Sequence, residues 1–416
     1  MKRYFNLNKE FDVFHLIKFI RPIAFNLIDN GYKNFILGWT NDEDDIVSYD
    51  SSNEFFKRIS NIDDFNFGYF GYDLKNDFLP NTYSENIDIH EFPESVFFKA
   101  SYVIIKKNEQ TLFFGNQKNL KNLLKIIEEL VNSNTKNFQQ KKISLIPLTS
   151  KEEYLKRVKQ IKSNIQLGNT YELNYCTQFY AVDKILNVED TYIKLRSKSK
   201  APFSNLMVIK NIKLLSSSPE RFLRRQNQNL ISQPIKGTSK RAADLTKDRK
   251  LKFELINSEK ERAENIMIVD LVRNDFSKIA SKNSVSVKEL CKLYSFPTVH
   301  QLISTVECKI ADNEELEKIL KSTFPMGSMT GAPKLKSVHL IDQFEDFKRG
   351  IYSGSSGYFS PNNSFDFNVV IRSILHNSEA KTISCSVGSA ITIKSDPVSE
   401  YNECLVKLHA IQNTLN

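Results

Sequence analysis

Apolar side chains recur at helical spacing near residue 150. Four of them stand three or four residues apart, namely Tyr154, Val158, Ile161 and Ile165. This spacing places them on one face of an α-helix. Ser150-Lys-Glu-Glu153 forms a capping box in front of them, and Gly168 stands where the pattern stops. These signals predict a helix that begins after Ser150 and ends before Gly168.

A second helix is predicted toward the end of the sequence. Asp396 is a favourable N-cap, and Pro397 suits the first helical position. Apolar residues then recur on one side, at Cys404, Leu408, Ile411 and Leu415. We expect this side of the helix to be buried.

Alternating apolar and polar residues predict strands elsewhere. The clearest segments are 96–105, 111–114, 207–215 and 365–375. The first two are joined by polar residues, which indicates a hairpin. In the last segment the apolar residues form one face, and Arg372 belongs to the other. Hairpins mixed with helices, without a regular alternation of strand and helix, favour an α+β fold over a doubly wound one.

The polar stretch 132–142 is the best candidate for a boundary within the chain. We place the boundary near residue 148, so that an N-terminal lobe covers residues 1–148 and a second domain covers residues 149–416. A chain of 416 residues is long enough for both, at roughly 150 residues per domain.

Charge and cysteine content narrow the functional classes. The formal net charge is +9, but acidic and basic residues are interleaved, which disfavours a nucleic-acid-binding protein. No apolar run approaches about 18 residues, and the first ten residues are too polar for a signal peptide, so we expect a soluble cytoplasmic protein. The five cysteines lack metal-binding spacing and a Gly-x-Cys-x-Gly elbow. A glutaminase site within this chain is therefore not expected.

Two pairs of glutamates are candidates for a metal site. Glu261 and Glu264 stand three residues apart in a helical stretch, and Glu400 and Glu403 repeat this spacing. Mg²⁺ prefers oxygen ligands and commonly bridges one or two carboxylates to an anionic substrate. Two solvated helix faces would have the same spacing, so the pattern alone leaves both interpretations open.

Three further features have a chemical and a structural interpretation. Lys236, in a turn, is either an exposed lysine or a nucleophile that a pocket keeps neutral. Glu220 is either an ion-paired carboxylate or a general acid. The turn Gly327-Ser-Met-Thr330-Gly-Ala-Pro-Lys334 either cradles an anion with its N–H groups or only caps a helix. His300 is likewise either structural or catalytic.

Taken together, these segments resemble the chorismate-utilising enzymes. The resemblance covers residues 150–416, and residues 1–148 match chiefly through Gly68-Tyr-Phe-Gly-Tyr-Asp-Leu74. The matching segments, in order, are Gly168-Asn-Thr-Tyr-Glu-Leu-Asn174, Ser218-Pro-Glu-Arg221, Pro234-Ile-Lys-Gly-Thr238, Glu261-Arg-Ala-Glu-Asn-Ile-Met-Ile-Val-Asp-Leu-Val-Arg-Asn-Asp275, His300, Phe324-Pro-Met-Gly-Ser-Met-Thr-Gly-Ala-Pro-Lys334, Arg349-Gly-Ile-Tyr352, Ile371-Arg372 and Ser395-Asp-Pro-Val-Ser-Glu-Tyr-Asn-Glu403.

The resemblance implies a large two-lobed α+β sandwich of mostly antiparallel sheets wrapped by helices, with chorismate and Mg²⁺ bound between the lobes. It implies that Glu264 and Glu403 contact Mg²⁺ and that Glu261 and Glu400 support the metal through water. The implied contacts of chorismate are Gly237, Thr238, His300, Thr330, Tyr352, Arg372, Gly388 and Ser389. Of these, Tyr352 and Arg372 would hold the enolpyruvyl carboxylate.

Within this family, Pro234-Ile-Lys236-Gly-Thr238 is similar to component I of the aminodeoxychorismate synthases, whereas anthranilate synthases typically carry alanine in place of Lys236. The implied reaction converts chorismate and ammonia to 4-amino-4-deoxychorismate, on the route to p-aminobenzoate and folate. Lys236 would attack the ring, and Glu220 would protonate the departing hydroxyl. A separate glutamine amidotransferase, component II, would supply the ammonia. Anthranilate synthase component I is the alternative.

Two positions differ from the usual family pattern. Glu172 stands where glutamine is frequent, and Gly388-Ser-Ala390 stands where Gly-Ala-Gly is common. In isochorismate and salicylate synthases, the position of Glu172 holds a lysine that activates water. Glu172 therefore argues against those two activities.

Overall fold

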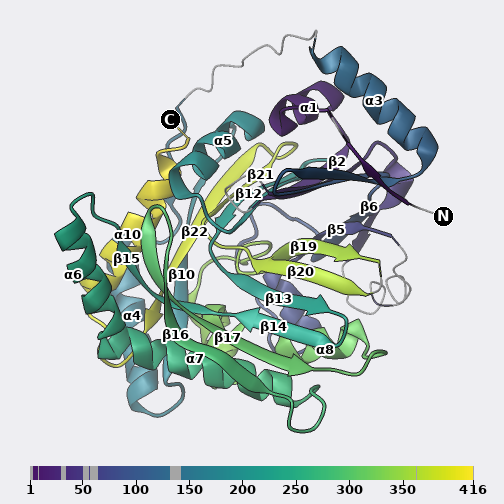
Figure 1. Ribbon diagram of the computed structural model, residues 1–416. Coiled ribbons are helices and arrows are strands. Elements are labelled where there is room, and N and C mark those ends of the chain that lie inside the picture. Colours follow the sequence, from purple (N-terminus) through teal and green to yellow (C-terminus); the bar gives the residue numbers. More distant parts are fainter. Residues whose placement is uncertain are drawn as a thin grey trace.

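Two large antiparallel sheets form the centre of the protein, and helices surround them (Figure 1). The computed structural model describes residues 3–7, 9–29, 34–49, 56, 64–131, 142–361 and 363–415. Most of the polar stretch 132–142, which we predicted as a boundary, lies outside these residues.

The first sheet combines strands from both ends of the sequence. Its strand order is β1 (Arg3–Asn6), β8 (Gln110–Gly115), β7 (Tyr102–Lys107), β3 (Phe35–Thr40), β2 (Ala24–Asp29), β11 (Phe203–Ile209), β12 (Ile212–Ser218), β21 (Ser373–Asn377), β22 (Thr382–Ile391), β10 (Glu172–Ala181) and β18 (Gly331–Ala332), with β9 (Ile146–Pro147) beside β10. Strand β2 pairs with β11, so the sheet continues across the boundary that we placed at residue 148.

The second sheet is built in the same way. Its order is β15 (Ile235–Lys240), β17 (Val299–Lys309), β14 (Asn229–Gln233), β13 (Arg221–Gln226), β20 (Ser364–Val369), β19 (Ser355–Ser360), β5 (Asn66–Phe70), β6 (Ser95–Lys99) and β4 (Ile46–Tyr49), with β16 (Ser286–Ser295) beside β17. Here β5 pairs with β19. Both sheets therefore contain strands from each side of residue 148.

The helices fall into two groups. Those that pack on the first sheet are α1 (Val13–Ile20), α3 (Gln117–Val131), α4 (Lys151–Gln166), α5 (Val188–Ser199), α9 (Lys334–Phe344) and α10 (Pro397–Gln412). Those beside the second sheet are α6 (Leu245–Ile256), α7 (Glu259–Ser277) and α8 (Leu316–Thr323). Short 3₁₀ turns are η1 (Glu43–Asp45), η2 (Tyr72–Asp77) and η3 (Gly327–Met329). No helix of the described residues is long and apolar enough to cross a membrane.

The protein has two cores. The core between the sheets is rich in phenylalanine, with Phe70, Phe97 and Phe367 in mutual contact. The core between the first sheet and its helices contains the apolar face of α4, including Tyr154 and Val158. This arrangement of two mostly antiparallel sheets wrapped by helices confirms the predicted α+β fold.

Both predicted helices are confirmed, together with their caps. The Ser150 hydroxyl accepts a hydrogen bond from the Glu153 N–H at 3.2 Å, and the Asp396 carboxylate accepts one from the Ser399 N–H at 2.9 Å. Helix α10 ends at Gln412, but Leu415 beyond it is still fully buried.

The hairpin between β7 and β8 is also confirmed, but three predicted strands are each divided in two. Segment 96–105 leaves the second sheet after Lys99 and enters the first at Tyr102. Segment 365–375 also passes from the second sheet, at β20, to the first, at β21, and it breaks at Arg372, which has φ +52°. Segment 207–215 turns back at Lys210, with φ +50°. At the two crossings between sheets, apolar alternation continues because both sheets bury residues there, so the pattern conceals the break.

Candidate active site

Two of the predicted site residues, Glu220 and Arg372, lie where the chain passes between the two sheets. Glu220 stands in the two-residue link between β12 of the first sheet and β13 of the second. Arg372 stands in the link from β20 back to β21. Lys236 lies on the edge strand β15, beside α7. The fold thus brings residues that are far apart in the sequence to one region between the sheets.

Lys236 forms a buried ion pair with Glu172, at the start of β10. The Lys236 Nζ lies 2.9 Å from Glu172 Oε1, and the two side chains are 11% and 1% exposed. Burial lowers the pKa of the Lys236 ammonium, but the nearby carboxylates, above all Glu172, raise it by more. The second oxygen of Glu172 is buried without a hydrogen-bond partner among the described residues. Lys236 is therefore a buried lysine, and the exposed-turn interpretation is wrong.

Glu220 is buried in an environment that favours its protonated form. Burial raises the pKa of this carboxyl to about 7, and the Ser328 hydroxyl and the Lys236 ammonium oppose part of that rise. A carboxyl with this pKa holds a proton at neutral pH and can release it. Glu220 therefore has the protonation behaviour of a general acid.

The four predicted metal ligands lie on two helices that Lys260 links. Glu261 and Glu264 project from α7, and Glu400 and Glu403 project from α10. The Lys260 Nζ links the helices, at 3.9 Å from both Glu264 Oε1 and Glu400 Oε1. Sequence reasoning missed Lys260, although it directly precedes the first glutamate.

The glutamates differ in their electrostatic surroundings. Burial raises the pKa of Glu264 to about 7, and the Oε1 atom of Glu264 is buried without a hydrogen-bond partner in the described parts. Burial also raises the pKa of Glu261. For Glu403, burial acts in the same direction, but the Lys407 ammonium at 2.8 Å outweighs it and lowers the pKa. Bringing like charges together in this way destabilises them unless a cation is present.

These carboxylates partly meet the requirements of a divalent cation. All four donors are oxygens, which Mg²⁺ prefers, and Glu264 Oε1 has an unsatisfied lone pair. Within the described residues, however, no three His, Cys, Asp or Glu side chains gather at metal-ligand spacing. Because Mg²⁺ keeps several waters and binds through one or two carboxylates, the residues present fit a metal that also takes ligands from the substrate.

Arg372 and Tyr352 provide a positive group and a hydroxyl beside this region. Tyr352 is buried and donates its hydroxyl toward Cys176 Sγ at 3.8 Å. Burial lowers the pKa of the Arg372 guanidinium, while Tyr352 and Glu403 act on it in the opposite direction. No described residue forms a hydrogen bond or ion pair with the Arg372 guanidinium. An unpaired, half-buried guanidinium is suited to bind a carboxylate of a ligand.

Two glycines allow close packing around the site. Gly237 has φ +88°, and a Cβ there would lie 3.2 Å from Glu261 Oε2, so glycine is required at this position. A Cβ on Gly388 would lie only 2.5 Å from Cys176 Sγ. The Gly388 carbonyl accepts a hydrogen bond from Lys407 Nζ at 2.7 Å. Thr238 lies next to Gly237 on β15 and accepts a hydrogen bond from Gln301 Nε2 at 3.4 Å.

Three predicted substrate contacts have side chains that are already engaged. His300 uses both ring nitrogens, at 2.9 Å from Asp248 Oδ1 and 2.9 Å from Ser295 Oγ. The Ser389 hydroxyl lies 3.2 Å from the Tyr154 hydroxyl, on the helix side of the sheet. The Thr330 hydroxyl donates to the Met326 carbonyl at 3.2 Å. Ser389 can therefore meet a ligand only through its backbone.

The buried ion pair between Arg349 and Glu345, to which the sequence analysis gave no role, holds two backbone segments next to the site. Arg349 pairs with Glu345 at 2.6 Å, and both side chains are 1% exposed. The Arg349 guanidinium also donates to the carbonyls of Asn174 and Met329, at 2.9 and 2.7 Å. It thus fixes β10, which carries Glu172, to the turn before Thr330. The motif Arg349-Gly-Ile-Tyr352 was visible in the sequence, but its contacts were not.

The family model described as chorismate binding enzyme matches residues 28–413. The chain belongs to this family. Aminodeoxychorismate synthase component 1 of Escherichia coli (strain K12) is 32% identical over 350 residues, which cover 84% of this chain and 76% of that protein. A probable chloroplastic aminodeoxychorismate synthase of Oryza sativa subsp. japonica is 43% identical over 63% of this chain. The chain spans only 29% of the rice relative.

Solved structures share the fold at lower identity. Anthranilate synthase component I from Streptococcus pneumoniae TIGR4 superposes with a TM-score of 0.78 at 20% identity, covering 99% of this chain and 92% of that one. The menaquinone-specific isochorismate synthase of Escherichia coli also has a TM-score of 0.78, at 15% identity, covering 100% of this chain and 95% of that one. These similarities confirm the expected fold of chorismate-utilising enzymes.

Proposed function

We propose that this chain is the chorismate-converting component of an aminodeoxychorismate synthase, which joins chorismate and ammonia to form 4-amino-4-deoxychorismate for p-aminobenzoate and folate synthesis. The observation that carries the proposal is the presence of protonatable Glu220 and of Glu264 on α7 around the buried Lys236, both of which act electrostatically on its ammonium. The curated relatives named aminodeoxychorismate synthase support it.

The proposed chemistry proceeds in two displacements. The neutral amine of Lys236 forms a bond to ring C2, the electrons of the ring double bonds shift, and the C4–O bond breaks while Glu220 gives its proton to the departing oxygen. Ammonia then forms a bond to C4, and Lys236 leaves C2 with its electron pair. The new C4 ammonium returns one proton to the Glu220 carboxylate. The sum is chorismate plus ammonia giving the amino product plus water.

Charged groups would hold the substrate in place. We assign the enolpyruvyl carboxylate to the Arg372 guanidinium and the Tyr352 hydroxyl. We assign Mg²⁺ to Glu264 and Glu403, with Glu261 and Glu400 in support through water. When bound, the cation supplies a positive charge that holds the ring carboxylate and relieves the repulsion among the glutamates. Lys260 would then move away from Glu264, because the two cations repel each other.

The ammonia would come from a separate glutamine amidotransferase. All five cysteines of this chain are buried, and burial raises the pKa of each thiol. A glutaminase needs an accessible thiolate as its nucleophile. The name component 1 of the Escherichia coli relative also implies a second component.

Product identification tests the proposal directly. Purified chain, chorismate, Mg²⁺ and ammonium chloride should give 4-amino-4-deoxychorismate, identified by its mass. Fluorescent anthranilate as the main product would instead support anthranilate synthase component I. If chorismate is not consumed under these conditions, the proposed activity is wrong.

A further inference from the structure

The segment Gly68-Tyr-Phe-Gly-Tyr-Asp-Leu74 is the part of the N-terminal lobe that resembles the family most, and the proposed reaction uses none of its residues. It forms the end of β5 and the start of η2. Tyr72 and Asp73 of η2 are buried, at 1% and 5% exposure. A carboxylate that is buried this deeply needs partners, because its lost hydration is costly. The partners of Asp73 therefore show what the segment holds.

Asp73 binds a turn that follows 277 residues later in the chain. Its Oδ2 atom accepts a hydrogen bond from the Gly350 N–H at 2.9 Å. The Tyr72 N–H donates to the Gly350 carbonyl at 2.6 Å, so both backbone groups of Gly350 are bound to η2. Gly350 has φ +53°, a left-handed conformation that favours glycine. These contacts fix the turn at its left-handed residue.

Lys75 restrains the Asp73 carboxylate through its other oxygen. The Lys75 side chain is fully buried, and its Nζ lies 3.8 Å from Asp73 Oδ1 and 3.1 Å from Asp342 Oδ2 of α9. Burial raises the pKa of Asp73, while Lys75 and the Gly350 N–H act in the opposite direction. The Asp73 carboxylate is thus held between a buried ammonium and the backbone of the turn.

The same turn carries Tyr352 and holds the chain just before Arg372. Its Ser353 N–H donates to the Val370 carbonyl at 2.9 Å, and the Val370 N–H donates back to the Gly354 carbonyl at 2.9 Å. Val370 stands two residues before Arg372. The turn therefore supports both residues to which we assign the enolpyruvyl carboxylate.

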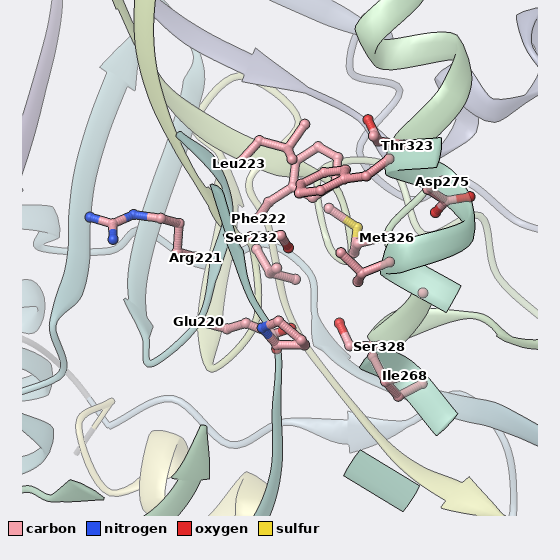
Figure 2. Close-up of a pocket in the computed structure, with 15 residues that line it drawn as sticks. Glu220, Arg221, Phe222, Leu223, Ser232, Ile268, Asp275, Thr323, Met326 and Ser328 are labelled. Carbon is pink, nitrogen blue, oxygen red and sulfur yellow. The ribbon is translucent and has the colours of Figure 1, made fainter. Parts of the chain in front are cut away.

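Glu220 is connected to the same end of β20 but has an anchor of its own. Val369 donates its N–H to the Glu220 carbonyl at 3.1 Å, and both residues line a small cavity between β13 and α7 (Figure 2). The Glu220 N–H also donates to the Ser218 hydroxyl at 3.2 Å. Substrate binding by Tyr352 and Arg372, more than the position of Glu220, is therefore the property that the turn controls.

We propose that Asp73 is a positioning residue for chorismate binding. Through its hydrogen bond with Gly350, it holds the turn that carries Tyr352 and that supports the chain before Arg372. The inference rests on the proposed function for the identity of the ligand that these residues bind. It gives the N-terminal lobe a part in the site, although none of the predicted substrate contacts lies within residues 1–148.

Asp73→Ala and Asp73→Asn test the proposal as a pair. Alanine removes the acceptor, so the Kd for chorismate should rise by about tenfold or more. Asparagine keeps an oxygen that can accept the Gly350 N–H, so its Kd should stay within about threefold of the wild-type value. Calorimetric titration with chorismate, in magnesium chloride and without ammonium, measures both.

Two further variants control for loss of stability. Asn76→Ala is the matched control, because Asn76 Oδ1 accepts a hydrogen bond from Lys75 Nζ at 2.9 Å in the same 3₁₀ turn. It disturbs the surroundings of Lys75 and should leave the Kd for chorismate unchanged. If Asp73→Ala does not fold, Asp73→Val takes its place, since valine fills more of the space and also offers no acceptor.

Hydrogen exchange of the chain without ligand separates failure of this inference from failure of the proposed function. The backbone amides of residues 349–354 should exchange at least about tenfold faster in Asp73→Ala than in the wild type. If either this exchange or the Kd of Asp73→Ala matches the wild type, or if Asp73→Asn loses chorismate as fully as Asp73→Ala, the proposal is wrong. If the wild-type chain binds chorismate but forms no 4-amino-4-deoxychorismate, the proposed function fails, and the Asp73 variants still decide this inference.

Discussion

In the proposed reaction, Lys236 is an ammonium at one moment and a neutral nucleophile at another, and its neighbours act on its pKa. Burial alone would favour the neutral amine. The carboxylates of Glu172, Glu264 and Glu220 oppose this and raise its pKa. Only Glu172 lies within ion-pair distance of Lys236 in the described residues. The balance between burial and this one contact therefore decides how much neutral lysine is available.

Lys236→Ala should nearly abolish formation of the 4-amino product. Without the amine no bond forms at C2, and ammonia in the vacated space can attack only C2, so any residual product should be a 2-amino species or anthranilate. Products are identified by mass after incubation with chorismate and ammonium. Lys240→Ala, an exposed position on the same strand, is the control. A variant that retains the 4-amino product within about tenfold, only about 1.4 kcal/mol in barrier, would exclude covalent catalysis by Lys236.

Glu172→Gln should shift the pH dependence of the reaction toward lower pH. The glutamine oxygen can still accept the hydrogen bond from Lys236, but it carries no charge, so the pKa of Lys236 falls and the neutral amine is present at lower pH. The measurement is kcat/KM for chorismate across pH at fixed free ammonia, where the acidic limb should move to lower pH. Glu307→Gln, a surface pair with Lys288, should leave the limb in place. An unchanged limb in Glu172→Gln would mean that Lys236 does not limit the rate.

At the scale of elements, the local signals in the sequence were sufficient for helices α4 and α10 but not for the strand breaks. The caps of α4 and α10 are contacts between residues three apart, so the sequence displays them directly. The breaks at Arg372 and at Lys99–Tyr102 depend on which sheet each half joins, and this is decided by partners far away in the chain. Because both sheets bury alternate residues, alternation cannot locate the crossing.

The difference between local and long-range contacts also explains which site residues could be placed from the sequence. The glutamate pairs of α7 and α10 were predictable as helix faces, and in the structure Lys260 links Glu264 of one pair to Glu400 of the other. The roles of His300 and Ser389 depend on long-range partners, Asp248 and Tyr154. Neither partner has a motif that links it to these residues. Their predicted contact with substrate remains a prediction, and Ser389 can make it only through its backbone.

Removing one carboxylate from each helix should show that α7 and α10 share a cation. Glu264→Gln and Glu403→Gln should each weaken Mg²⁺ binding by at least about tenfold, because a neutral amide binds a hard dication poorly. Calorimetric titration of the purified chain with Mg²⁺, with and without chorismate, measures this directly, and turnover should fall in parallel. Glu259→Gln, an exposed residue at the start of α7, is the control. Unchanged affinity and turnover in both variants would refute the metal assignment.

At the scale of the whole molecule, the two sheets make the chain one cooperative structure. Residues 1–148 contribute strands to both sheets, so the N-terminal lobe has no sheet of its own. The sequence suggested a boundary because residues 132–142 are polar, but a polar stretch can equally join two parts of one structure. Strand pairings across about 180 residues, such as β2 with β11, leave no local trace in the sequence.

His90 connects the loop after η2 to the first sheet and makes the stability of the whole molecule depend on pH. Its ring nitrogens lie 2.8 Å from Thr382 Oγ1 and 2.7 Å from Ser384 Oγ on β22. Burial, together with His376, lowers the pKa of His90 from 6.5 to about 3. The folded state therefore favours the neutral ring. Its contribution to stability is complete above pH 6.5 and is lost as the pH falls from there toward 3.

We expect His90→Gln to flatten the acid dependence of unfolding. Between pH 6.5 and 3, the free energy of unfolding of the wild-type chain should fall by up to about 1.4 kcal/mol per pH unit more than that of the variant. The reason is that the His90 ring is neutral in the folded protein and takes up a proton when unfolding exposes it. Urea unfolding followed by circular dichroism at pH 7.5, 6.0 and 5.0 measures the difference. Glu220 and Glu264, whose pKa values are about 7, change stability in the opposite direction but equally in both chains, so the comparison isolates His90. The control is His409→Gln, at an exposed position on α10, which should follow the wild-type curve. If His90→Gln also follows the wild-type curve, His90 is already charged in the folded protein, and burial does not lower its pKa.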